Sequence, residues 1–307
     1  MAVVLAALLP VFLLIIMGFG LRHTLLKEDA HWVGLERLVY YVLFPALLIE
    51  TLARANLTTV PIGGVGGALM LAVLTMGAFC LLMRKPLQAS LGLDGPAFTS
   101  VFQAATRWQT FVGLAVAGNL YGDLGIALAS VAMVAMIPLL NVMSVAVLAR
   151  YARPQHLAWP QILLAVAQNP FIWACVVGLV INVLQLPIPK VVYDFANALG
   201  RSSLAIGLLV VGAGLQLSMI RPTVTVSLTV FLKLIAMPAI AISYALLFGL
   251  SGPSLAVVAC CASVPAASNA YVLAKQMGGD APLLAQILTL QTILAAVTMP
   301  AIIALIR

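Results

Sequence analysis

The stretch "SVPAASNAYVLAK" (Ser263–Lys275) places a proline, several small residues and a serine–asparagine pair inside an otherwise apolar region. Pro265 removes a backbone donor and clashes with the preceding turn of a helix. In hydrocarbon the freed carbonyl groups need partners, so non-helical backbone is tolerated only where it is buried in protein or lines a wet cavity. The stretch therefore predicts an interrupted helix, with partners supplied by Ser263, Ser268 and Asn269. A packed proline kink is the alternative.

The composition of the whole chain points to a lipid environment. Of its 307 residues, 64% are hydrophobic and only 7% are charged, whereas a soluble domain has about 25% charged residues. The net charge of +7 is carried by residues scattered singly or in pairs, without the basic stripe of a nucleic-acid-binding protein. The four cysteines form neither a CxxC motif nor a cluster with histidine, so we expect no metal and no cofactor.

Ten apolar runs are each long enough for a membrane-spanning helix, which needs about 20 residues. The first run carries no charge and is interpreted as a retained span, because a signal peptide begins with basic residues. The runs cover residues 2–21, 35–55, 62–83, 97–119, 125–148, 162–184, 192–217, 224–249, 254–276 and 282–306.

The distribution of lysine and arginine between the loops predicts the orientation of these spans, because basic loops stay in the cytoplasm. One side collects nine basic residues, namely Arg22, Lys27, Arg37, Arg84, Lys85, Arg150, Arg153, Arg221 and Lys275. The other side collects Arg54, Lys190 and Arg307, while Arg107, Arg201 and Lys233 fall within spans. Both termini are therefore expected outside a bacterial cytoplasmic (inner) membrane.

Two matching spacings indicate an internal repeat. Gly95–Pro96 is followed after 25 residues by Gly122–Asp123, and Gly252–Pro253 is followed after 25 residues by Gly279–Asp280. An odd number of spans per copy inverts the second copy across the membrane, which is a recurring plan of secondary transporters. We therefore predict an all-α membrane protein with ten transmembrane helices in two inverted five-helix repeats, residues 1–150 and 160–307. Its helices 4 and 9 are broken and cross at the midplane.

A polar cluster in span 4 lies at the same depth as Pro265 in span 9. Its members are Gln103, Thr106, Arg107, Gln109 and Thr110. An arginine at the centre of a span costs about 2.5–3.5 kcal/mol, so it is a functional candidate. Two half-helices beginning at mid-depth would present free N–H groups and partial positive charge beside it, which favours an anion. The alternative is that Arg107 pairs with backbone carbonyl groups and has a structural role.

Five stretches of the chain resemble the auxin efflux carrier family of membrane transporters, in its bacterial branch. They are "LPVFLLIIMGFGLR" (9–22), "LFPALLIETLARANL" (43–57), "TRWQTFVGLAVAGNLYGD" (106–123), "NPFIWACVVGLVINVLQLPIP" (169–189) and "VPAASNAYVLAKQMGGDAPLLAQILTLQT" (264–292). The resemblance implies a fold similar to bile-acid sodium symporters, with a scaffold of spans 1, 2, 6 and 7 and a transport unit of spans 3–5 and 8–10. It also implies carboxylic acids as substrates.

By this resemblance the crossing point is formed by six residues, namely Arg107, Gln109, Thr110, Pro265, Ser268 and Asn269; Gln103 and Tyr271 complete the candidate substrate-binding set. The chain departs from the family pattern in two places. Relatives often have asparagine at the position of Gln109 and a proline near Ala115. Without that proline, the break in span 4 must depend on Thr106, Gly113 and side-chain bonding.

Two further charged residues are candidates for energy coupling. Glu50 either carries a coupling proton or pairs with Arg54 four positions on, and Lys233 either adds positive charge to the pathway or extends to the membrane surface. A sodium site would favour acidic ligands near the crossing point, so uniport or proton coupling is preferred. The chain contains no ATP-binding loop.

These features predict a secondary transporter of organic anions such as mono- or dicarboxylates, working by alternating access. Its partners are a small organic acid and the lipid bilayer, without nucleic acid, and a homodimer is compatible with the sequence. An intramembrane enzyme is disfavoured because His23, His31 and His156 all lie in loops. The alternatives are a nontransporting membrane scaffold and a carrier of neutral or amphipathic solutes.

Overall fold

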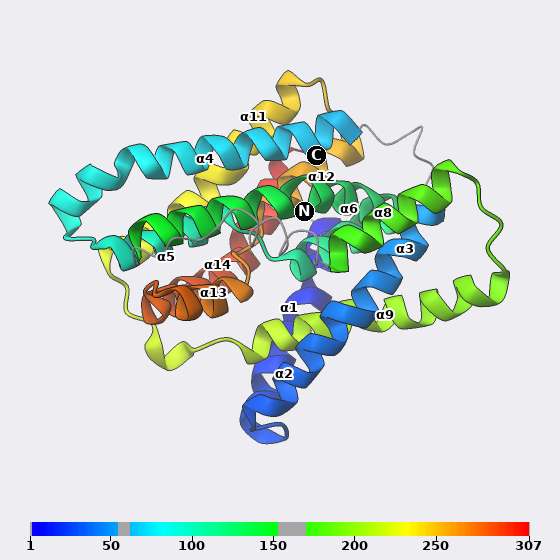
Figure 1. Cartoon of the computed structure of the whole chain (residues 1–307), viewed down its shortest axis with the longest axis horizontal. Helices are drawn as coiled ribbons and strands as arrows, with labels where there is room; N and C mark the ends of the chain where they lie inside the picture. Colours follow the sequence, from blue (N-terminus) through cyan, green and yellow to red (C-terminus); the bar gives the residue numbers. More distant parts are fainter. Residues whose placement is uncertain (1, 55–61, 153–169, 307) are drawn as a thin grey trace.

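Helices form all the regular secondary structure in the described part of the chain, residues 2–54, 62–152 and 170–306, of a computed structural model (Figure 1). The first half contains α1 (Ala2–Thr24), α2 (Asp29–Leu38), the π-helical turn η1 (Val39–Leu43), α3 (Phe44–Arg54), α4 (Ile62–Leu91), α5 (Gly95–Thr106) and α6 (Thr110–Tyr151). The second half contains α8 (Pro170–Val183), α9 (Lys190–Ala213), η3 (Leu217–Met219), α10 (Val224–Phe231), the π-helical turn η4 (Leu232–Ala236), α11 (Met237–Leu247), α12 (Gly252–Ser263), α13 (Asn269–Met277) and α14 (Ala281–Leu305).

Seven helical runs among the described residues are long and apolar enough to cross a membrane, which confirms an all-α membrane protein. They are Val4–Thr24, Asp29–Arg54, Gly63–Leu91, Gly95–Tyr151, Lys190–Ala213, Val224–Leu247 and Ala281–Leu305. Two shorter apolar helices, Trp173–Val183 and Gly252–Ser263, accompany them. Residues 162–169 of the sixth predicted span lie outside the described residues, as do Arg153, His156 and Arg307.

A sharp turn at Gly122 divides α6 into two segments. Gly122 has φ 57° and ψ −140°, a combination that only glycine adopts without strain. Beyond the turn the chain doubles back, so that Gly118 lies against the side chain of Ile126. The turn falls between the predicted spans 97–119 and 125–148.

The helices pack in two groups. In one, α1 lies along α9, and α3 packs between α8 and α9. In the other, α4 packs on α6 and α11, and α12 packs on α6, α11 and α14. Figure 1 shows α4 and α11 at the upper edge of the molecule, and α9 on the lower side, where it packs with α2.

Helices α1 and α9 approach each other at two glycines. A Cβ atom on Gly18 would overlap the backbone of Leu209, and a Cβ atom on Gly212 would overlap the backbone of Ile15. Small residues allow helix backbones in membranes to come this close. The contact is reciprocal, so each helix presents a glycine to the backbone of the other.

Candidate functional site

Both interruptions predicted from the sequence are present. Helix α5 ends at Thr106 and α6 begins at Thr110; between them Arg107 is extended, with φ −70° and ψ 158°. Helix α12 ends at Ser263 and α13 begins at Asn269. We call residues 107–109 the first break and residues 264–268 the second break.

Gln109 joins the two breaks through two hydrogen bonds. Its backbone N–H donates to the carbonyl oxygen of Pro265 at 2.8 Å, and its side-chain Nε2 donates to Oγ of Ser268 at 3.0 Å. The prediction that Ser263 supplies a hydrogen-bond partner to the second break is wrong, because Ser263 Oγ donates to the carbonyl of Ala259 in its own helix at 2.6 Å. Serine commonly bonds one turn back in a helix, so the first break supplies the partner instead.

The first break forms without a proline. Thr106 Oγ1 donates to the carbonyl of Phe102 at 2.8 Å, and the N–H of Arg107 makes the last α-helical bond of α5, to Gln103. The next helical bond of α6 begins at Gly113, whose N–H donates to the carbonyl of Gln109 at 3.1 Å. The extended residues between are held by Gln109, so the second break stabilises the first.

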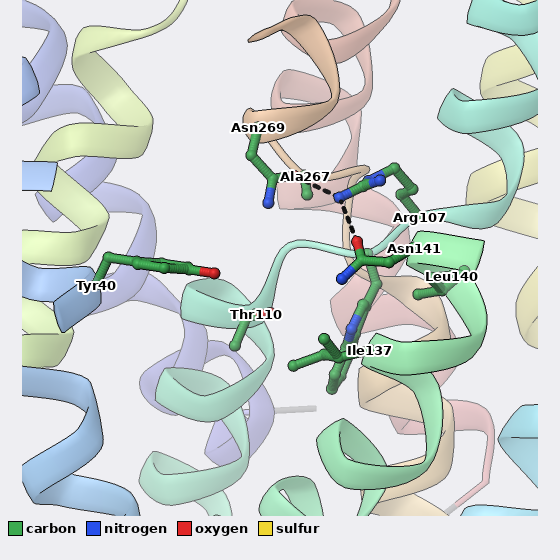
Figure 2. Close-up of a pocket in the computed structure, with 9 residues that line it drawn as sticks. Tyr40, Arg107, Thr110, Ile137, Leu140, Asn141, Ala267 and Asn269 are labelled. Atoms are coloured by element: carbon green, nitrogen blue, oxygen red, sulfur yellow. Dashed lines mark hydrogen bonds between the residues drawn. The ribbon is translucent and has the colours of Figure 1, made fainter. Parts of the chain in front are cut away.

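The breaks border a polar cavity of about 80 Å³, here called the arginine cavity (Figure 2). It is lined by Tyr40, Arg107, Trp108, Thr110, Ile137, Leu140, Asn141, Ala267 and Asn269. Figure 2 shows the Tyr40 hydroxyl directed inward from the side opposite Arg107. Tyr40 belongs to η1, which packs with α2, α3 and α9, so both packing groups contribute to the walls.

The guanidinium of Arg107 is buried, and no carboxylate among the described residues forms an ion pair with it. The residue is 6% exposed. Its Nη2 donates to the amide oxygens of Asn269 at 3.0 Å and Asn141 at 3.4 Å, and its Nη1 has no hydrogen-bond partner in the described part of the chain. Because both acceptors are neutral amides, the cavity keeps a net positive charge on one wall.

Two helices begin at the arginine cavity. Thr110 is the first residue of α6 and Asn269 the first residue of α13. The prediction of free N–H groups at both ends is wrong for two groups of α13, because the N–H groups of Ala270 and Tyr271 donate to the carbonyl oxygens of Ala267 and Ser268 at 3.0 and 3.1 Å. The first N–H groups of α6 have no acceptor within their helix, so α6 is the end that can offer donors.

A second, wider cavity of about 1040 Å³ lies on the other face of the second break. Ala266 and Ser268 line this wide cavity, while Ala267 and Asn269 line the arginine cavity, so alternate residues of one segment face two spaces. The wide cavity extends to Arg22, His23 and Lys275, the side that the sequence predicts to be cytoplasmic, with Phe19, Trp32, Gln216, Tyr271, Leu288 and Thr292 among its walls.

Five of the eight residues predicted to bind substrate do not line the arginine cavity. Gln109 and Pro265 line neither cavity, and Ser268 lines only the wide cavity. Tyr271 lines the wide cavity instead. Gln103 is fully buried and lines neither cavity, and its two amide atoms have no partner among the described residues.

The two candidates for coupling lie in different surroundings. Glu50 is 3.5 Å from Arg54 and lines neither cavity, which fits the ion pair that the sequence offered as one alternative. Lys233 belongs to η4 and is 0% exposed, so the prediction that it extends to the membrane surface is wrong. No described residue partners its Nζ.

Sequence reasoning missed Tyr40 and Asn141 as wall residues. They lie in the apolar runs 35–55 and 125–148, respectively. The signal for Asn141 was present, because it is the one amide in its run. Tyr40 carried no such signal, since tyrosine is common near membrane surfaces.

Interrupted helices that meet beside a buried charge, within an all-helical membrane protein, define a membrane transporter. Comparison with known proteins agrees. Residues 153–303 match the family model described as "Membrane transport protein". The chain is also 27% identical to an "Uncharacterized transporter" of Methanothermobacter thermautotrophicus, over 95% of both chains. These matches confirm the resemblance to the auxin efflux carrier family of membrane transporters.

Proposed function

We propose that the protein is a secondary transporter of organic anions such as mono- or dicarboxylates, which bind in the arginine cavity. The observation that carries the proposal is the buried guanidinium of Arg107, with one nitrogen unpartnered among the described residues and only neutral amides as acceptors. A carboxylate would complete its hydrogen bonds with a charge-assisted pair. The beginning of α6 adds partial positive charge on the same cavity.

The membrane layout we propose is ten spans in two inverted five-helix repeats, residues 1–150 and 160–307. The run Gly95–Tyr151 has 57 residues, more than twice the length of one span, and it reverses at Gly122. The predicted span 254–276 is divided into α12 and α13. The predicted span 97–119 is likewise divided between α5 and α6. These two divisions support spans 4 and 9 as the broken pair, crossing near the midplane.

Alternating access would follow from motion between the two packing groups. The group of α1, α2, α3, α8 and α9 would be the scaffold, and the remaining helices the transport unit. The arginine cavity is walled by Tyr40 on one group and Arg107 on the other, so relative motion would open or close it. The wide cavity supports an access route from the side of Arg22 and Lys275.

For energy coupling we propose uniport or proton coupling, with Lys233 the stronger coupling candidate because Glu50 is already paired. The membrane we propose is the bacterial cytoplasmic membrane, with both termini outside. This orientation rests on the excess of loop lysine and arginine on one side of the predicted spans.

Counterflow in liposomes tests the proposal. Vesicles loaded with one carboxylate are expected to accumulate its labelled form, and a panel of mono- and dicarboxylates and neutral solutes ranks the substrates. Arg107→Ala is expected to reduce uptake at least tenfold. Arg150→Ala is the matched control, because it removes the same charge from an exposed position on α6. Neutral solutes that outcompete every acid, or full activity in Arg107→Ala, would contradict the anion assignment; loaded vesicles that accumulate none of the panel would favour a nontransporting scaffold.

A further inference from the structure

Gln291 on α14 bonds both to the last turn of α5, next to the first break, and to the second break. Its Nε2 donates to the carbonyl oxygen of Ala104 at 3.0 Å, and its Oε1 accepts from the N–H of Ala266 at 3.0 Å. The residue is 0% exposed. A single amide therefore spans from the end of α5 to the second break.

Both of these backbone groups lose their helical partner through the breaks. In a continuous helix the carbonyl of Ala104 would accept from the N–H of Trp108, and the N–H of Ala266 would donate to Ala262. Trp108 lies in the first break and Ala266 in the second, so each helical bond is lost. Buried backbone groups that lose a helical hydrogen bond need another partner. Gln291 supplies one to the carbonyl of Ala104 and one to the N–H of Ala266.

We propose that Gln291 is a positioning residue of the transport site, which fixes the spacing of the two breaks and thereby places Arg107 and Asn269 for the substrate. Ala104 lies three residues before Arg107, and Ala266 lies three residues before Asn269. Gln291 lines neither cavity, so it acts through the backbone and not on the substrate. The proposal rests on the proposed function and adds that α14 moves with both breaks as one unit.

The chemistry of the side chain makes the role specific. An amide carries a donor group, NH₂, and an acceptor, the carbonyl oxygen, and this contact uses both. Leucine offers neither. An ionised glutamate accepts from Ala266 but cannot donate to Ala104, while a protonated glutamate has the same donor and acceptor as glutamine.

Counterflow of Gln291→Leu and Gln291→Glu tests this role. Gln291→Leu is expected to raise the half-saturation concentration at least tenfold and to lower the maximal rate by a smaller factor. Gln291→Glu is expected to recover toward wild type as the pH falls, when each activity is divided by that of wild type at the same pH. Gln286→Leu and Gln286→Glu are matched controls, because Gln286 is a half-buried glutamine on α14 outside both cavities. Unchanged half-saturation in Gln291→Leu, or a pH-independent ratio for Gln291→Glu, would overturn the proposal.

Amide hydrogen exchange on the purified protein tests the same role without a substrate. Residues 264–268 are expected to exchange at least tenfold faster in Gln291→Leu than in Gln286→Leu. Equal exchange would overturn the role of Gln291 even if carboxylates are transported. Faster exchange in a protein whose wild type transports no acid would support the role of Gln291 and reject the substrate class. If Gln291→Leu does not fold, the transport activity of Gln291→Glu relative to wild type decides: recovery at low pH supports the role of Gln291, and no recovery overturns it.

Discussion

The backbone N–H of Gln109 donates to the carbonyl of Pro265, so the two breaks complete each other across opposite halves of the chain. Proline interrupts a helix at its own position and needs no second proline in the partner. The first break is held in its extended form because the N–H of Gln109 has an acceptor outside its own helix. One proline is therefore sufficient to stabilise two interruptions.

Asn269→Asp is expected to weaken anion binding without loss of stability. Its carboxylate would lie near the Nη2 atom of Arg107, which is 3.0 Å from the present amide oxygen, and the charge-assisted bond would neutralise the guanidinium. The half-saturation concentration for a carboxylate should rise at least tenfold, about 1.4 kcal/mol. Counterflow and thermal unfolding of the purified protein measure the two effects.

The control for this substitution is Asn197→Asp, which makes the same change on α9 outside both cavities. It should leave transport within twofold of wild type. Acid transport by Asn269→Asp with unchanged half-saturation would show that the substrate does not use Arg107.

Cysteine labelling is expected to reveal the access route. Ser268→Cys and Tyr271→Cys line the wide cavity and should react with a small charged thiol reagent applied from the side of Arg22 and Lys275. The described native cysteines, Cys80, Cys175, Cys260 and Cys261, are buried, so the unmodified protein gives a low background. Sealed vesicles of known orientation make the measurement.

Ala262→Cys serves as the control for labelling, because it is fully buried and lines neither cavity. It should remain unmodified. Faster labelling of Ser268→Cys from the opposite side would reverse the proposed orientation of the wide cavity.

Lys233→Met is expected to stabilise the protein. The substitution keeps an unbranched side chain only one atom shorter and removes a buried amine that has no partner among the described residues. Leaving a buried polar group unsatisfied costs about 1–3 kcal/mol, and a charged group costs more. Thermal unfolding should show the gain, whereas Lys85→Met, at an exposed position, should change stability by no more than about 0.5 kcal/mol.

If Lys233 takes part in proton coupling, we also expect an effect of its substitution on transport. Lys233→Met should then carry the same substrate with a flatter dependence of rate on pH than wild type. A destabilised Lys233→Met would instead indicate that the ammonium has a partner that favours its charge.

Gly122→Ala is expected to destabilise the turn within α6. Holding a residue with a side chain at φ 57° and ψ −140° costs about 1–3 kcal/mol. Gly20→Ala is the control, because Gly20 lies in α1 with open space around the position of a Cβ atom. The midpoint of thermal unfolding should fall for Gly122→Ala only, and equal midpoints would show that the turn relaxes without strain.

Much of the helical framework was readable from residues whose physical role is local. Apolar runs predicted helices, and helix-starting residues marked several of their ends: Asp280 caps α14 by accepting from the N–H of Leu283 at 2.9 Å, beside Pro282. Pro265 and Arg107 marked the breaks because proline and charge are both costly in a membrane helix.

The partners of the breaks could not be read from the sequence, because they depend on packing between distant segments. Ser263 stands close to Pro265 in the chain, yet its hydroxyl bonds within α12. Gln291 stands far from both breaks, and its amide had no feature to distinguish it from that of Gln286 in the same helix. The π-helical turns η1 and η4, which carry Tyr40 and Lys233, likewise depend on tertiary contacts.

The close approach of α1 and α9 at Gly18 and Gly212 fixes the position of these two helices relative to each other. Neither α1 nor α9 can rotate about its axis or slide along the other without driving side chains into the opposing backbone. Spin labels on these two helices should therefore report one constant separation through every stage of a transport cycle, and all displacement should appear in labels carried by their neighbours.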